Sequence, residues 1–412
     1  MLRQTFKVEF VTPCFLGGAR DQAEWRGASI RGQLRWWFRA VAGAHFVQDL
    51  EKVRAAEEEI FGSTRRCSAL RVLPGLGPEA ERPDPAGIPF SESLEAKEIA
   101  KRWGDKSEAT VNRLRLQSRF SDPLHYLAYG PVTRGRLERP FLPASTSVSF
   151  DLQWVREPGG DLPELFASAL WAWLYLGGIG ARSRKGFGSL HLQHGPASWK
   201  APLNQDAFRN EAGKLLALGR RIDGEPAWTC FSQSSRIFVG SEGFKTGEEA
   251  LSRLGGWLIA FRRRYGKATD TRTFGGQPVA GRDYEWAAPN GTKLRQGIPD
   301  RVGFGLPLPF TRRVDDQFRG ESVIWGEDGK DEKDPRRASP LLLHVARFEN
   351  LYFPVLTWLP AQFLPQKARL GFKGHPFPAE GQVEPARPGI VSYFLDDLVG
   401  RKRLVAEIGA SS

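Results

Sequence analysis

The order of hydrophobic patterns in the first 200 residues restricts the fold more than any other feature of the sequence. Residues 5–11 alternate apolar and polar side chains, as an amphipathic strand does. The later patterns predict a helix over 30–46, strands over 68–73 and 145–155, a helix over 161–178 and a strand over 187–193. This order is that of the ferredoxin-like fold, a twisted antiparallel sheet with two helices on one face. The first part of the chain is therefore predicted to be an α+β unit of this type.

A second, more irregular copy of the same unit is predicted after residue 204. It would contain a helix from about 204 to 221 and further candidate elements over 234–240, 248–266, 301–310, 339–348, 352–360 and 388–400. We therefore expect two ferredoxin-like domains, 1–200 and 204–412. Insertions are expected near 75–140, with a helix at 93–104, and near 313–338, where the charged stretch 326–337 is typical of a loop.

The helix predicted over 30–46 carries two stripes of different chemistry. Ser29 is its expected N-cap. An apolar stripe for the core consists of Ile30, Leu34, Trp37, Phe38 and Val41. A neighbouring stripe consists of Arg31, Arg35 and Arg39 and is called the arginine rail here.

The chain is basic, and its positive charge lies mostly on arginine. The net charge is +12, and the 59 basic residues include 43 arginines. Each side of Lys200 has an excess of about six positive charges. Because a guanidinium forks onto phosphate oxygens and stacks on bases, this composition is consistent with a polyanionic partner. A surface charge that only keeps the protein in solution explains the same numbers.

Cysteines and the N-terminal sequence limit the class of protein. Cys14, Cys67 and Cys230 are odd in number and far apart, which argues against a disulfide framework and a zinc cluster. The first residues alternate like a strand and lack a signal pattern, and the longest apolar run is too short to span a membrane. These features predict a cytoplasmic protein.

Residues 177–190, GGIGARSRKGFGSL, combine glycines with cations. A dinucleotide fingerprint is excluded because Ser183 replaces the third glycine and because the loop leads from a helix to a strand. The tetrapeptide 185–188 matches the first half of an RNA-recognition motif. The combination of glycines and cations predicts that this loop is a turn that binds phosphate. A plain turn with solvated cations remains the alternative. The candidate RNA-binding residues are Gly178, Gly180, Arg182, Ser183, Arg184, Lys185, Gly186 and Gly188.

Support for acid–base or metal chemistry is thin. His191 and His194 are three residues apart, which in a regular strand places them on opposite faces. Asp21 and Glu24 could hold a metal, or they could pair with neighbouring arginines. We expect no catalytic residue, no metal and no cofactor.

Three stretches together, 12–43, 57–63 and 177–190, resemble the RAMP superfamily of CRISPR-associated RNA-binding proteins, and within it the first-subunit family of the Cmr (type III-B) effector complex. Residues 336–348 and 352–360 are similar to the same family. The resemblance implies two ferredoxin-like domains and a non-catalytic role in antiviral defence. It also implies crRNA, target RNA and other RAMP subunits as partners, with a position near the crRNA 3′ end. In RAMP subunits that cleave RNA, an aspartate in the loop after the first strand takes part in metal-dependent cleavage. Asp21 lies in the equivalent loop of this chain.

One basic groove between the arginine rail and the glycine-rich loop is the predicted RNA site. Arg20 and Arg26 would line its rim, and Trp36 would either stack on a base or pack under the insertion. Two other functions remain open, which are metal-dependent RNA cleavage through Asp21 and purely architectural docking of a neighbouring protein. Weaker candidates for RNA contact in the second domain are Arg262, Arg263, Arg264, Arg336 and Arg337.

Overall fold

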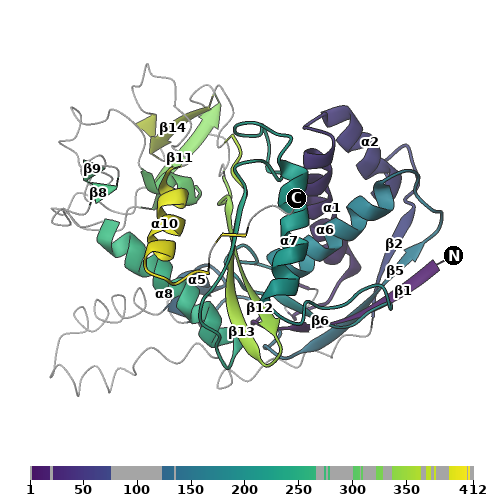
Figure 1. Cartoon of the computed structure of the whole chain (residues 1–412), viewed down its shortest axis with the longest axis horizontal. Helices are drawn as coiled ribbons and strands as arrows, with labels where there is room; N and C mark the ends of the chain where they lie inside the picture. The colour runs from purple at the N-terminus through teal and green to yellow at the C-terminus, as the bar shows by residue number, and fades with distance from the viewer. Residues whose placement is uncertain are drawn as a thin grey trace.

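The structure is a computed structural model (Figure 1). It describes residues 2–18, 22–75, 123–133, 136–265, 273–274, 277–278, 300–306, 308–309, 322–327, 336–362, 368–372, 375–376, 389–405 and 407–408. Arg20, Asp21, the helix predicted at 93–104 and most of the charged stretch 326–337 lie outside these residues.

The first unit has the predicted ferredoxin-like topology. Its sheet has the order β2-β5-β1-β6, and every neighbouring pair is antiparallel. Helices α1 and α6 cover one face, and α2 packs beside α1. In chain order the elements are β1 (Leu2–Phe10), α1 (Gly27–His45), α2 (Leu50–Phe61), β2 (Leu70–Pro74), β5 (Ser147–Trp154), α6 (Leu162–Leu176) and β6 (Leu190–His194).

Ser29 is not the N-cap of α1, contrary to the prediction. The helix begins at Gly27, and Arg26 occupies the cap position without a side-chain cap bond. Gly27 approaches the carbonyl oxygen of Val72 so closely that a Cβ atom there would lie 2.8 Å from it. The start of α1 is therefore set by its packing against β2 and not by a capping side chain.

The second unit repeats the topology. The sheet β12-β13-β7 is antiparallel, and the chain returns beside β7 at its end, where the Val405 amide donates to the Val239 carbonyl at 2.9 Å. The Ile408 amide donates to Ile237 in the same way at 3.1 Å. These elements are β7 (Arg236–Val239), α8 (Gly247–Tyr265), β12 (Leu341–Phe348), β13 (Leu351–Trp358) and α10 (Gly389–Gly400), preceded by α7 (Gln205–Gly219).

Additional elements make this half irregular. The candidate element over 301–310 is a 3-10 helix in its first part, η4 (Asp300–Phe304). Gly305 has a φ of +113°, which ends that helix in a conformation that glycine adopts easily. A separate sheet contains β10 (Leu308–Pro309), β11 (Ser322–Glu327), β14 (Ala368–Phe372) and β15 (His375–Pro376). Short elements elsewhere are α5 (Pro123–Leu127), β3 (Val132–Thr133), β4 (Arg136–Leu137), β8 (Thr273–Phe274) and β9 (Gln277–Pro278).

The sheet of the second unit is buried on both faces. Leu342, Ala346 and Phe348 of β12 belong to the core that contains α1, α6 and α7, whereas Leu341 and Leu343 pack with α8 and α10. This explains why β12 is apolar almost throughout and does not alternate. In Figure 1 helix α7 lies between the helices of the first unit and this sheet. The first of these two clusters therefore contains buried residues of both units.

Candidate nucleic-acid interface

The two units meet where the edge strands β6 and β12 approach each other, and the glycine-rich loop lies at this junction. The Leu343 amide donates to the Arg184 carbonyl at 3.1 Å, and the Val345 amide donates to the Ser189 hydroxyl at 3.1 Å. His344 Nδ1 lies 2.6 Å from the Gly177 carbonyl oxygen. The loop thus connects the first unit to the edge of the second sheet.

The glycines of the loop serve its internal packing. Gly180, Gly186 and Gly188 have φ values of +87°, +87° and +66°. A Cβ atom on Gly188 would lie 2.1 Å from the Ile179 carbonyl oxygen, and one on Gly180 would lie 2.4 Å from that of Phe15. On Gly178 it would meet the Gly188 oxygen at 3.0 Å. The sequence predicts that phosphate groups approach the backbone closely at these glycines. Protein atoms already occupy the space beside them.

The backbone amides of the loop are also largely used inside the protein. Gly186 donates to the Ser183 carbonyl at 3.2 Å, and Gly188 donates to Pro13 at 2.9 Å. Phe187, which matched the aromatic of the RNA-recognition motif, is fully buried against Phe15 with ring centroids 5.0 Å apart. The motif match therefore reflects a core residue and not a base-stacking one.

The cations of the loop are held in half-buried positions. Arg184 Nη1 donates to the Ser339 carbonyl at 2.9 Å, and its guanidinium carbon lies 4.9 Å from the centre of the Trp36 ring. Burial, with a further contribution from the charge of Arg337, lowers the pKa of Arg184 to about 10. Burial likewise lowers the pKa of Arg182, and the charge of Arg336 adds to this effect.

Four arginines from both units therefore gather at one place, and we call Arg182, Arg184, Arg336 and Arg337 the junction arginines. Within the part of the chain that the structure describes, Arg182, Arg184 and Arg336 form no ion pair with a carboxylate. Like charges that approach each other without a counterion destabilise a fold, and a bound polyanion would relieve this repulsion. Sequence reasoning had named Arg336 and Arg337 only as weaker candidates, because nothing local shows that they lie beside the loop.

Trp36 is the point at which α1 meets the loop. Its ring is half-buried, contacts the Arg184 guanidinium and meets the edge of Trp37 at a centroid distance of 4.8 Å. Base stacking by Trp36 remains a proposal. Packing under the insertion involves residues outside the described ranges.

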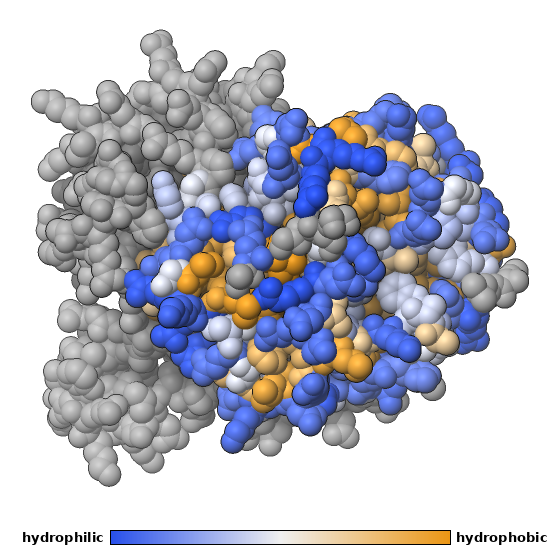
Figure 2. Space-filling model, viewed as in Figure 1, coloured by the Kyte–Doolittle hydropathy of each residue, from blue (hydrophilic) through white to orange (hydrophobic). Residues whose placement is uncertain are grey.

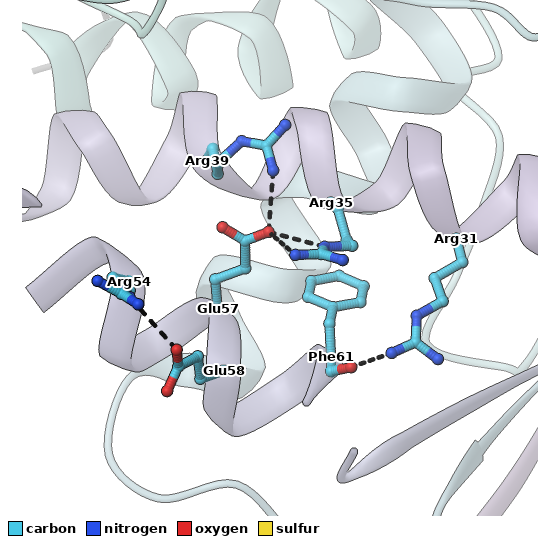
Figure 3. A network of polar contacts seen from close by, with 7 residues as sticks. All are labelled: Arg31, Arg35, Arg39, Arg54, Glu57, Glu58 and Phe61. Carbon is cyan, nitrogen blue, oxygen red and sulfur yellow. Dashed lines mark hydrogen bonds and ion pairs between the residues drawn. The ribbon is translucent and has the colours of Figure 1, made fainter. Parts of the chain in front are cut away.

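The side chains of the arginine rail have their partners on α2 (Figure 3), and one groove that joins the rail to the loop stays a prediction. Arg35 Nη2 and Arg39 Nη1 contact the Glu57 carboxylate at 2.7 and 2.9 Å. Arg31 donates to the Phe61 carbonyl oxygen. Glu57 was missed at the sequence level, since only the packing of α2 against α1 shows that this glutamate lies between two rail arginines.

The remaining predicted cations are spread over separate places. Arg26 is exposed at the start of α1, whereas Arg20 falls outside the described residues. Arg262, Arg263 and Arg264 end helix α8, and the structure does not describe their side chains.

His191 and His194 lie on the same side of the sheet, contrary to the prediction. The pairing of β1 with β6 shifts register between Lys7 and Val8, so that Lys7 pairs with His194 while Glu9 pairs with His191. Both histidines line a cavity of 780 Å³ together with Lys7. This β-bulge breaks the two-residue period on which the expectation depended. Burial lowers the pKa of His191 to about 4, so its imidazole is neutral at physiological pH.

Metal-ligating groups and membrane-spanning helices are both absent from the described residues. No group of three or more His, Cys, Asp or Glu side chains that could hold a metal ion occurs there. None of the helices described is long and apolar enough to cross a bilayer.

Comparison with known proteins agrees with this architecture. Residues 7–191 match the family model of the RAMP superfamily. The CRISPR system Cmr subunit Cmr1-2 of Pyrococcus furiosus is 30% identical over 204 residues, which are 47% of this chain and 96% of that protein. The chain belongs to the RAMP superfamily. Within this superfamily, Cmr1-1 of the same organism is 28% identical over 195 residues, 47% of this chain and 48% of that protein. The crystal structure of Cmr1 from P. furiosus in its apo form shares the fold over the full length of both chains, with a TM-score of 0.54 and 20% identity.

Proposed function

We propose that this RAMP protein is a non-catalytic RNA-binding subunit of a type III-B CRISPR ribonucleoprotein. In this role it would hold crRNA, target RNA or both near the crRNA 3′ end, beside other RAMP subunits. The single observation that carries the proposal is the cluster of junction arginines, which come from both units and in which Arg184 of the first unit donates to the Ser339 carbonyl of the second. The names of the relatives, CRISPR system Cmr subunits, support the assignment to such a complex.

The proposed binding is mainly electrostatic. Arginines that neutralise phosphates release condensed counterions, so the affinity falls with salt by a slope of roughly 0.7 per phosphate contact on a single strand. Binding of this kind requires no cofactor. The sequence-independent character of backbone contacts suits a subunit that must accept many guide sequences.

The decisive test compares two double variants that remove the same charge. Arg182→Gln with Arg336→Gln removes one junction arginine from each unit, whereas Arg401→Gln with Arg403→Gln removes two exposed arginines beyond α10. Filter binding of single-stranded RNA across a salt series should show a weaker affinity for the junction variant and a slope lowered by roughly 1.4, twice the value for one contact. Equal affinities and slopes in the two variants would refute the junction as the RNA site.

The two alternative functions lack a comparable observation. Asp21, on which RNA cleavage would depend, is not among the described residues. Purely architectural docking, in which a basic face binds a neighbouring protein, predicts partner binding without RNA protection, and the face shown in Figure 2 carries hydrophilic residues around separate apolar patches. Incubation of the protein with labelled RNA and magnesium, beside Asp21→Asn, tests cleavage. A cut that this substitution abolishes would replace the proposal.

A further inference from the structure

We propose that a depression at the C-terminal end of α2 is a second phosphate-binding site for RNA, separate from the junction arginines. The inference rests on the proposed RNA-binding function and adds a site to it. Arg31 and Arg35 of α1 form one wall of the depression, and the turn 61–68 forms the other. Its volume is 480 Å³, within the range of roughly 300–1,000 Å³ in which small-ligand sites fall.

The turn that forms the second wall is fixed by its own hydrogen bonds. Gly62 ends α2 with a φ of +73°. The Ser63 amide donates to the Arg66 carbonyl at 2.8 Å, and the Arg65 amide donates to the Ser63 hydroxyl oxygen at 3.2 Å. Ser68 anchors the far side of the turn by donating to the Ile60 carbonyl at 2.8 Å. Because the wall is already ordered, little conformational entropy would be lost when an anion binds.

Positive charge exceeds negative charge around the depression. On the α1 side, one carboxylate, Glu57, serves both Arg35 and Arg39. On the turn side, one carboxylate, Glu59, serves both Arg66 and Arg156. No carboxylate is among the lining residues, which include three arginines.

The end of α2 works against anion binding, but only in part. The C-terminus of a helix carries roughly half a negative charge, and that of α2 points toward the depression. Arg31 donates to the Phe61 carbonyl oxygen there, so a full positive charge faces about half of a negative one (Figure 3). The charge of neighbouring Arg35 and burial both lower the pKa of Arg31, with burial the larger cause. The net field at the depression therefore favours an anion.

A phosphate group of RNA fits these walls better than the carboxylates of an acidic peptide. Guanidinium groups bind phosphate oxygens in a bidentate manner, and the exposed hydroxyl-bearing residues Ser63 and Thr64 add donors of the kind found at phosphate sites. The arginine rail extends beyond the depression. Arg31 and Arg35 line it, and Arg39 lies one further step of about 6 Å along α1. A regular row of cations suits the repeating charges of a nucleic-acid strand.

Cys67 provides a local reporter because it lines the depression and is exposed, whereas Cys14 and Cys230 are buried. Burial raises the pKa of Cys14 and raises that of Cys230 to about 12, so neither thiol competes for an alkylating reagent near pH 7. An uncharged maleimide should therefore modify Cys67 selectively. Single-stranded RNA at ten times its Kd should slow this reaction by up to about tenfold if RNA covers the site.

Arg66→Gln and Arg54→Gln form a matched pair of variants. Each removes one exposed arginine that pairs with a glutamate of α2, but only Arg66 lines the depression. Arg66→Gln should weaken RNA binding, lower the salt slope by roughly 0.7 and reduce the protection of Cys67. Arg54→Gln should change each of these much less. Equal behaviour of the two variants, or no protection of Cys67 by RNA in the unaltered protein, overturns the proposal.

Further experiments identify which kind of phosphate binds and distinguish this site from the junction site. RNA with a 3′-hydroxyl, RNA with a 3′-phosphate and inorganic phosphate distinguish a backbone phosphate from a terminal one, and protection by any of them supports the site. Protection by a polyglutamate peptide but not by RNA refutes it. If the Arg182→Gln, Arg336→Gln variant loses RNA binding while Arg66→Gln matches Arg54→Gln, the junction site stands and this one falls. The reverse result removes the junction site and keeps this one.

Discussion

His344 shows how a single buried side chain connects the glycine-rich loop to the second unit. It is fully buried on β12, and its Nδ1 contacts the Gly177 carbonyl oxygen, which assigns the proton to Nδ1. Its Nε2 is buried and has no hydrogen-bond partner among the residues that the structure describes. Burial lowers the pKa of His344 to about 4; the hydrogen bond with Gly177 opposes this effect, and the neighbouring His191 adds a smaller lowering. In the folded protein the imidazole of His344 is therefore neutral at physiological pH.

The lowered pKa of His344 predicts acid sensitivity. An unfolded histidine protonates near pH 6.5, so between pH 6.5 and about 4 the unfolded state binds more protons than the folded state and stability falls as the pH falls. Urea unfolding at pH 7.5 and pH 5 should show a loss of about 1–2 kcal/mol in the free energy of unfolding from this residue. His344→Gln should be less stable at pH 7.5 and less dependent on pH. The same pH dependence in both proteins would contradict this assignment.

Helix α2 determines how much of the arginine rail is available to a ligand. The Glu57 side chain is only 12% exposed and accepts from both Arg35 and Arg39. A carboxylate in this position orders the rail and neutralises half of the charge on these two arginines. The helix therefore stabilises the fold while it weakens the rail as a phosphate-binding surface.

Glu57→Gln should consequently have opposite effects on stability and on RNA binding. Loss of the two ion pairs should lower the free energy of unfolding by on the order of 1 kcal/mol. The freed charge should tighten single-stranded RNA binding and steepen its salt dependence. Glu58→Gln, which breaks the exposed pair with Arg54, is the control for the added charge. Weaker RNA binding by Glu57→Gln than by this control would show that the rail does not face RNA.

The order of helices and strands was largely predictable from the sequence, but the contacts between these elements were not. Apolar periodicity is a local property, so it gave the order of strands and helices in both units. The register shift at Lys7 and Val8 depends on pairing between strands that are distant in sequence, and it reversed the expected placement of His194. The loop and the rail were each recognisable from composition. The pairing of the rail with Glu57 of α2, and the approach of Arg336 to Arg182, arise only from tertiary structure.

The two units behave as one body because they share a core and a set of polar contacts. One face of β12 packs on α6 and α7, and Arg347 on the same strand contacts the Glu9 carboxylate of β1 at 3.2 Å. Separation of the units would expose Leu342, Ala346 and Phe348 to water. Burial of three such side chains favours the assembled state by several kcal/mol, at about 25 cal/mol per Å² of apolar surface.

We therefore expect one cooperative unfolding transition for the whole chain and not one for each unit. Differential scanning calorimetry should give a calorimetric enthalpy that agrees with the van't Hoff enthalpy. Two resolved transitions, or an enthalpy ratio near two, would show that the units unfold independently.

The junction arginines come from both units, and this has a thermodynamic consequence. If RNA binds Arg182 and Arg336 together, as proposed, it binds only while the two sheets stay in place, so it would hold the two units together across the junction. Linkage makes the effect reciprocal. Any substitution that loosens the contact of β6 with β12 should cost RNA affinity even where it removes no charge, and saturating RNA should restore part of the stability lost by such a variant.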